Sequence, residues 1–247
     1  MIATTTRSLA IPVANHWLRA ILRTPALPRA AILLLPPFFH EWQRSYRLFA
    51  QLAEALACAG IAVLRFDYRG CGDSGGADEE FLPSRAMTDA DAALSFLRTM
   101  IDAPIVLLGV RAGGLIARPL AEREGLPLWL WQPVADGASH LSELRERSLL
   151  QRNSRFRFPF LRRRQPPDPG VLMGHRLHPE FALELGILHN AREPALVIGP
   201  TEAATGAAAL GLEPALASWV GQVDISGSFP LPAIRRLAAG MAERMPG

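Results

Sequence analysis

The sequence predicts an α/β fold, with a mostly parallel central sheet and helices on both of its faces. Apolar runs typical of strands covered on both faces, such as Ala30–Leu35, Ile61–Asp67 and Ile105–Val110, alternate with segments of helical periodicity. The last of these runs enters a tight Gly-Val-Arg-Ala-Gly turn and then a helix. Hydrophobic residues make up 49% of the chain, enough for one large core. We therefore expect a single domain over residues 1–247.

The first half of the chain is expected to hold an edge hairpin followed by strand–helix units. Glycine and proline mark the ends of these segments. The expected strands are Arg7–Pro12, Trp17–Leu22, Ala30–Leu35, Ile61–Asp67 and Ile105–Val110, and the expected helices are Ser45–Ala59, Arg85–Met100 and a segment that ends near Arg123.

The second half interrupts this alternation. Residues 138–190 are rich in arginine, contain Pro166–Pro169, and predict helical pieces around a loop, which we interpret as a cap or lid insertion. Strands and helices alternate before and after this insertion. The expected segments are strands Leu126–Trp131, Pro194–Gly199 and Ala217–Ile225, and a helix Leu231–Met245.

Four loops should meet at one edge of the sheet, because ligands in parallel sheets bind beyond the carboxyl ends of the strands. These loops are Pro36–Glu41, Tyr68–Gly76, Arg111 with its neighbours, and Gln132–Gly137. We call this edge the mouth, and we expect the insertion to cap it.

Composition limits the chemistry. All 26 basic residues are arginine, so a Schiff-base or general-base lysine is excluded. One stretch gathers many of them, and such a block attracts an anionic substrate, an acidic protein or a phospholipid surface. Its members are Arg145, Arg147, Arg152, Arg155, Arg157, Arg162, Arg163 and Arg164.

Localisation follows from what the sequence does not contain. No uncharged apolar run approaches the roughly 18 residues of a membrane span, and residues 1–17 lack the apolar core of a secretory signal. Cys58 and Cys71 lie on different expected elements and are expected to be reduced. These features predict a cytoplasmic protein.

Arg111 stands at the apex of the tight turn. Strand, turn and helix together have the form of a nucleophile elbow, which presents one side chain above a sheet. Arginine stays protonated and cannot attack a carbonyl carbon. Its guanidinium either receives a carboxylate or phosphate of a ligand beside the helix N-terminus, or pairs internally, with Glu41 as the expected partner. Both roles can coexist.

The order of elements, the elbow and the stretch Phe66–Gly76 resemble the α/β-hydrolase superfamily. That stretch is similar to the superfamily's D-x-x-G-x-G-x-S-x-G loop. More narrowly, the chain resembles the exosortase-A-system-associated hydrolases of the second type, through the Gly-x-Arg-x-Gly elbow and the segments Pro36–Glu41, Pro133–Gly137 and Gly174–Leu177. The resemblance implies an association with bacterial exopolysaccharide and protein-sorting loci.

The superfamily's catalytic triad runs Ser, then Asp or Glu, then His along the chain. Arg111 holds the position of the serine, and Glu202 is the carboxylate expected after the strand that ends at Gly199. The loop Ser226–Pro230, where the base belongs, has no histidine, and none follows His189. Without nucleophile and base, the standard hydrolytic mechanism is not expected.

Other mouth residues carry two interpretations each. His40 and Glu41 are either an acid–base pair facing Arg111 or polar loop residues. Cys71 would need a histidine partner and a lowered pKa to act as a displaced nucleophile. Asp136 is either a loop cap or a charge partner for the arginine-rich cap.

Residues of the loop and the insertion add further alternatives. Asp73 and Ser74 are expected to build the turn through hydrogen bonds to the backbone. His175 or His178 could fold back over the mouth as a base, and the histidine spacing fits no metal site. The segment Arg155–Arg164 is a lid over an acyl or glycosyl ligand, a membrane-surface contact, or a solvated basic face.

The candidate site follows from these arguments. The candidate catalytic residues are Arg111, His40, Glu41 and Cys71, and the candidate substrate-binding residues are Phe38, Phe39, Val110, Ala112, Asp136 and Arg155. No metal and no cofactor is expected.

Two functions remain open from the sequence. One is an atypical acyl or ester hydrolase or transferase acting on a small anionic or acyl substrate without the usual triad. The alternative is a catalytically inactive pseudo-hydrolase that binds or scaffolds, with an acidic protein as a candidate partner. No nucleic-acid-binding module is recognisable.

Overall fold

The structure is a computed structural model that describes residues 3–155, 168–189, 193–200, 208–220 and 229–246. Within them the strands form an eight-stranded sheet whose first two neighbour pairs are antiparallel and whose remaining pairs are parallel. In spatial order the strands are β1 (Thr4–Val13), β2 (His16–Pro25), β4 (Ile61–Phe66), β3 (Ala30–Leu35), β5 (Ile105–Val110), β6 (Leu128–Trp131), β9 (Leu196–Gly199) and β10 (Ala208–Gly211).

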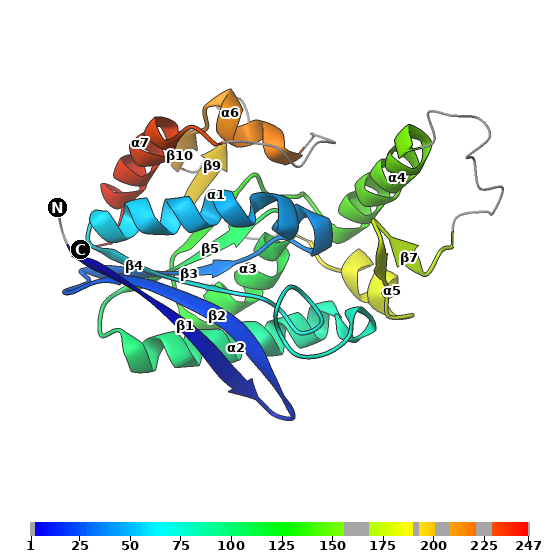
Figure 1. Ribbon diagram of the computed structural model, residues 1–247, viewed down its shortest axis with the longest axis horizontal. Coiled ribbons are helices and arrows are strands. Elements are labelled where there is room, and N and C mark those ends of the chain that lie inside the picture. Colours follow the sequence, from blue (N-terminus) through cyan, green and yellow to red (C-terminus); the bar gives the residue numbers. More distant parts are fainter. Residues whose placement is uncertain (1–2, 156–167, 190–192, 201–207, 221–228, 247) are drawn as a thin grey trace.

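Helices cover both faces of this sheet (Figure 1), which confirms the predicted fold class. α1 (Phe39–Cys58) and α7 (Leu231–Ala242) pack on one face, and α2 (Pro83–Met100) and α3 (Gly113–Glu124) pack on the other. Every residue of β3, β4 and β5 is buried, because each of these central strands contacts helices on both sides.

The prediction that residues 36–41 form a loop and that the helix begins at Ser45 was wrong. α1 begins at Phe39, so His40 and Glu41 lie in its first turn. The segment 39–44 contains Glu, Gln and Arg, which favour helices. The helix therefore starts as soon as the two prolines before it end, and it carries Glu41 toward the mouth.

The last expected strand, Ala217–Ile225, was also wrong in its described part. Pro214–Ala217 forms the short helix α6 and Ser218–Val220 forms the 3₁₀ helix η4, while residues 221–225 lie outside the described residues. Proline is favoured in the first turn of a helix, where its missing N–H costs nothing. The last strand of the described sheet is instead β10.

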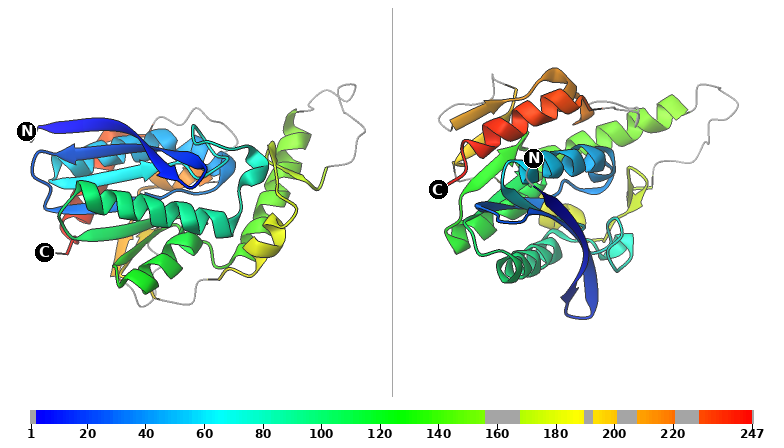
Figure 2. Two further views of the ribbon diagram at one scale, coloured as in Figure 1. Left: turned by 90° about the horizontal axis from the view of Figure 1, so that it is seen from below. Right: turned by 60° about the vertical axis from the view of Figure 1, so that its left-hand side comes forward.

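The region expected to be a cap contains α4 (Gly137–Arg155), a hairpin of β7 (Val171–Leu172) and β8 (His175–Arg176), and α5 (Phe181–Gly186). A bridge between Asp136 and His189 joins the two ends of the region. α4 projects away from the body of the molecule (Figure 1, Figure 2). Phe181 is fully buried against Phe39 and Phe81, so apolar contacts fasten the cap to the body.

The 3₁₀ helix η1 (Asp78–Glu80) follows the loop after β4. In the part of the chain that the structure describes, no helix is long and apolar enough to cross a membrane.

Candidate functional site

The backbone of the elbow has the form that the sequence predicts. Arg111 adopts a φ of 50°, and its N–H donates to the carbonyl of Trp131 at 2.9 Å. A Cβ on Gly113 would lie 2.4 Å from the carbonyl oxygens of Leu35 and Pro36, and one on Gly109 would lie 2.5 Å from the Gly114 Cα. Only glycine fits these close approaches, so the strand, turn and helix are locked around Arg111.

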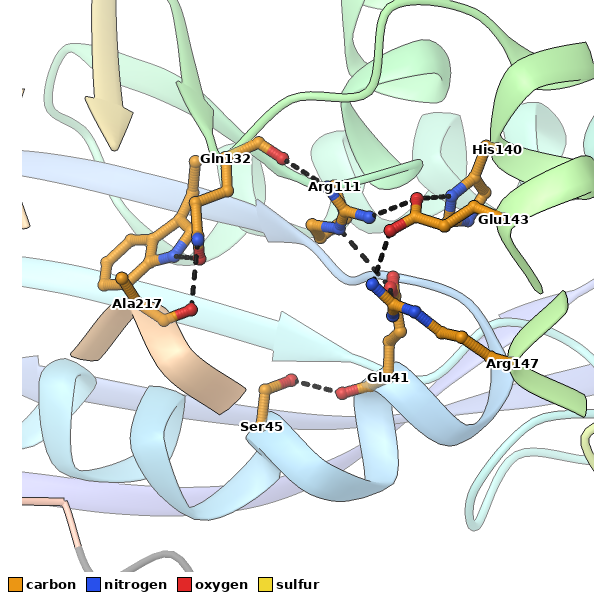
Figure 3. A network of polar contacts seen from close by, with 9 residues as sticks. Glu41, Ser45, Arg111, Gln132, His140, Glu143, Arg147 and Ala217 are labelled. Atoms are coloured by element: carbon orange, nitrogen blue, oxygen red, sulfur yellow. Dashed lines mark hydrogen bonds and ion pairs between the residues drawn. The ribbon is translucent and has the colours of Figure 1, made fainter. Parts of the chain in front are cut away.

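The guanidinium of Arg111 is buried and lies among carboxylates (Figure 3). Its Nε lies 3.3 Å from Glu41 Oε1, so the predicted Arg111–Glu41 pair is present. Its Nη2 lies 2.8 Å from Glu143 Oε2 on α4. Its Nη1 donates to the backbone carbonyl of Gln132 at 3.3 Å. The elbow side chain is thus held on three sides.

Arg147 completes the cluster from the cap. Its Nη1 lies 3.1 Å from Glu41 Oε1, and its Nη2 contacts Glu143 (Figure 3). Two arginines and two glutamates therefore alternate with no net charge. Arg111 and Glu41 belong to the body, whereas Glu143 and Arg147 belong to α4, so this elbow network connects the body to the cap.

The charges of the network depend on one another. Glu41 is only 1% exposed, and its Oε2 has no hydrogen-bond partner. The approach of His140 Nδ1 to within 3.5 Å of Glu143 Oε2 and the positive charges of Arg111 and Arg147 lower the pKa of Glu143 to about 2. Glu143 is therefore ionised at neutral pH.

Sequence reasoning did not single out Glu143 as a site residue. His140, Glu143 and Arg147 are spaced at i, i+3 and i+7, which places them on one face of a helix. That spacing was the available signal. The spacing alone does not show that this face of α4 is the one that contacts the elbow.

His40 lies beside the network but is not part of it. It is 7% exposed, and neither ring nitrogen has a hydrogen-bond partner among the described residues. Burial, together with the nearby positive charges of Arg44 and Arg147, lowers the pKa of His40 to about 3. The imidazole is therefore neutral at pH 7 and a weak base.

Cys71 lies in a separate small pocket of about 170 Å³ between the start of α1, the loop after β4 and the cap. Burial and nearby carboxylates raise the pKa of its thiol, and the backbone N–H of Phe39 offsets this only in part. His175 lines the same pocket, with its Nδ1 3.3 Å from Asp78 Oδ2 and its ring stacked on Phe39. His175, one of the two histidines expected to fold back over the mouth, therefore lies beside Cys71 in this pocket.

The other predicted residues serve the fold. Phe38, Val110 and Ala112 are fully buried, so their side chains belong to the core around the elbow. Asp136 accepts hydrogen bonds from the N–H and hydroxyl of Ser139 at 2.7 and 2.8 Å, as a loop cap would.

The loop after β4 is built by its own polar side chains. The Ser74 hydroxyl donates to the carbonyl of Asp67 at 2.6 Å and accepts from the N–H of Arg19. The N–H of Asp73 donates to the Asp67 carboxylate at 3.0 Å. Ser74 therefore has the turn-building role expected of it, and Asp73 takes part through its backbone.

Several predicted positions lie outside the description. These are the side chain of Arg155, the segment 156–164, Glu202 and residues 226–228.

Comparisons with known proteins agree with this architecture. Residues 28–127 match the family model for serine aminopeptidases of family S33. No curated protein matches the sequence.

Solved structures match along nearly the whole chain. A putative hydrolase from Agrobacterium vitis S4 is 18% identical with a TM-score of 0.60, over 99% of this chain and 100% of that one. Est1E from Butyrivibrio proteoclasticus, solved with ferulic acid, is 18% identical with a TM-score of 0.62, over 96% and 98%. A serine hydrolase homologue from Coxiella burnetii is 15% identical with a TM-score of 0.55, over 97% of both. The chain therefore has the α/β-hydrolase fold, with an arginine at the apex of its elbow.

Proposed function

We propose that the protein is a non-hydrolysing member of the α/β-hydrolase fold that acts as a binding or scaffolding subunit. The observation that carries this proposal is the guanidinium of Arg111, held at the nucleophile's position by Glu41 and Glu143. In this role the elbow does not attack a substrate. It fastens the cap to the body through charge.

The surrounding groups support this role. Hydrolysis on this fold needs a nucleophile and a base beside it. Arginine cannot be the nucleophile, no histidine follows His189 in the sequence, and His40 is a weak base. An anionic substrate would have to displace Glu41 or Glu143 from Arg111, because the network is already neutral.

The biological setting is part of the same proposal. The resemblance to the exosortase-associated hydrolases supports a place in a biosynthetic or exopolysaccharide-associated system in the cytoplasm. The arginines of the cap region support an acidic protein as partner.

A second candidate function, an atypical acyl hydrolase or transferase, rests on the pocket of Cys71. Cys71, His175 and Asp78 line that one pocket, and His175 Nδ1 faces Asp78. In this scheme His175 Nε2 takes the thiol proton, the sulfur attacks an acyl carbon, and the leaving group departs with that proton. Water or an acceptor alcohol then cleaves the thioester. The raised pKa of Cys71 opposes the first step.

One experiment separates the two candidates. Purified wild type, Arg111→Ala, Cys71→Ala and His175→Ala are assayed on a panel of aryl esters and acyl thioesters, and the hydrogen exchange of α4 is followed in parallel. The proposal predicts no turnover by wild type and faster exchange of α4 in Arg111→Ala, because the cap loses its anchor.

Two results would contradict the binding role. Turnover that is lost in Arg111→Ala would return chemistry to the elbow. Turnover that survives in Arg111→Ala but is lost in both Cys71→Ala and His175→Ala would establish the second candidate instead.

A further inference from the structure

A second arginine pair lies away from the elbow, on the face of the sheet where α1 meets the edge hairpin. Arg65 is on β4, and its strand neighbour on β2 is Ile21. Arg19 lies two residues before Ile21, and its carbonyl accepts from the N–H of Asp67 at 2.9 Å. Because side chains alternate along strands, Arg19 and Arg65 project from the same face as diagonal neighbours.

Arg65 is a buried cation that makes no ion pair with any described residue. It is 5% exposed, and no carboxylate lies within ion-pair distance of it in the part of the chain that the structure describes. Its Nε has no acceptor, its Nη1 reaches only the Tyr46 carbonyl at 3.4 Å, and its guanidinium carbon lies 4.9 Å from the centre of the Tyr46 ring. Burial lowers its pKa.

The side chain of Arg19 also lacks hydrogen-bond acceptors among the described residues. It is half-buried, its Nε is buried without an acceptor, and no hydrogen bond from its side chain is present among the described residues. Arg23, four residues farther along β2 on the same face, is different. It pairs with Glu54 and donates to Thr4 at 2.9 Å.

The carboxylate of Asp67 attracts Arg65 but forms no ion pair with it. Asp67 lies on the same face, but its Oδ1 accepts from Trp42 Nε1 at 2.6 Å and its Oδ2 accepts from the N–H of Asp73. Burial also raises the pKa of Asp67. The small side chain of Ala10 lies opposite Arg19 on β1, and therefore leaves the guanidinium uncovered on that side.

We propose that Arg19 and Arg65 form an oxyanion-binding site that takes a phosphate or carboxylate group. Two guanidinium groups with unused donors match the geometry of such an oxyanion. A bound oxyanion offsets the cost of burying Arg65 unpaired. Trp17, 44% exposed and on the same face of β2, offers an aromatic surface for the remainder of the ligand. This site is independent of the function proposed for the elbow.

The test uses inorganic phosphate and acetate as probes. Thermal unfolding of the full chain is followed as either salt replaces chloride at constant ionic strength, up to about 10 mM of the probe. Arg19→Gln is the main variant, because Arg19 is only half-buried and its loss leaves the core intact. Arg7→Gln is the matched control, since Arg7 lies exposed on β1 and its pairing with Leu22 places it on the opposite face.

The proposal predicts that one probe raises the Tm of wild type and of Arg7→Gln, and that Arg19→Gln weakens its apparent affinity about tenfold or more. The probe with the larger effect identifies phosphate or carboxylate. Sedimentation of wild type, but not of Arg19→Gln, with phosphatidic acid vesicles assigns the phosphate to a lipid headgroup, and a thermal shift without sedimentation assigns it to a free phosphate.

Two results overturn the proposal. One is the absence of a thermal shift in wild type with either probe. The other is an equal shift in wild type and Arg19→Gln, which would reduce the effect to general salt stabilisation.

Discussion

Arg111 and Arg65 are both arginines buried beside the central sheet, yet their surroundings differ. Arg111 is 8% exposed and contacts two glutamates, one from the body and one from the cap. Arg65 is 5% exposed and contacts an aromatic ring and a carbonyl. The first charge forms ion pairs inside the protein, and the second forms none with the described residues.

This difference separates a structural cation from one that is available for a ligand. A buried ion pair is costly to break, because removal of one partner leaves the other charge uncompensated. Removal of an unpaired buried cation leaves no such charge behind. Substitution of the same residue type at similar burial should therefore cost much more stability at Arg111 than at Arg65.

The sharpest test of the comparison is to replace each arginine by methionine. Arg111→Met should lower the free energy of unfolding by about 3 kcal/mol, because Glu41 keeps only Arg147 as a partner. Arg65→Met should change it by no more than about 1 kcal/mol. Urea denaturation at pH 7 measures both. Equal losses in the two variants would mean that compensation does not distinguish them, and Arg98→Met, at an exposed ion pair, serves as the control.

A smaller effect is expected from the neutral imidazole of His40. In the folded protein its pKa is lowered from 6.5 to about 3, so the unfolded chain binds a proton below pH 6.5 that the native state does not bind. Stability should therefore fall as the pH drops from 6.5 toward 3, by up to about 1.4 kcal/mol per pH unit from this group.

Unfolding of wild type and His40→Gln at pH 7 and pH 5 measures this contribution. The stability difference between the two proteins should shift in favour of His40→Gln by about 2 kcal/mol between these pH values. His189→Gln, at an exposed position, serves as the control. Parallel pH profiles for wild type and His40→Gln would mean that burial and the nearby arginines do not lower the pKa of His40.

The smallest effect concerns the cap side of the elbow network. Glu143→Gln should lower stability at pH 7 by about 1 kcal/mol, because this side chain is 38% exposed and its ion pairs are partly screened. The pKa of Glu143 is lowered from 4.5 to about 2, so its contribution is present above pH 4.5 and disappears as the pH falls to about 2.

Thermal unfolding at pH 7 and in acid checks this dependence. The difference between wild type and Glu143→Gln should be largest at pH 7 and vanish near pH 2. A difference that stays constant with pH would show that the glutamate contributes by packing and not by charge.

Much of the fold followed from local patterns. The buried runs of β3, β4 and β5 and the glycines of the elbow were recognisable, because burial on both faces and close backbone approach each demand particular residues. The boundaries that failed, at the start of α1 and at α6, lie in segments where a strand or loop pattern competed with helix-starting residues.

The candidate site was predictable only in part. The Arg111–Glu41 pair was one of the two roles expected of Arg111, because both residues were predicted to lie in loops at the same edge of the sheet. Glu143 and Arg147 entered the network because α4 turns one face toward the elbow. Arg19 and Arg65 came together through strand register, which no local pattern specifies.

The sequence by itself determined the α/β architecture, the elbow and the residue at its apex, because these depend on periodicity and on where glycine is required. The tertiary structure decided which charges meet: Arg111 forms ion pairs with two carboxylates, and Arg65 forms no ion pair with the described carboxylates. It also decided that the thiol of Cys71 has a raised pKa. Charge compensation and pKa are set by neighbours distant in sequence, so only the folded chain fixes them.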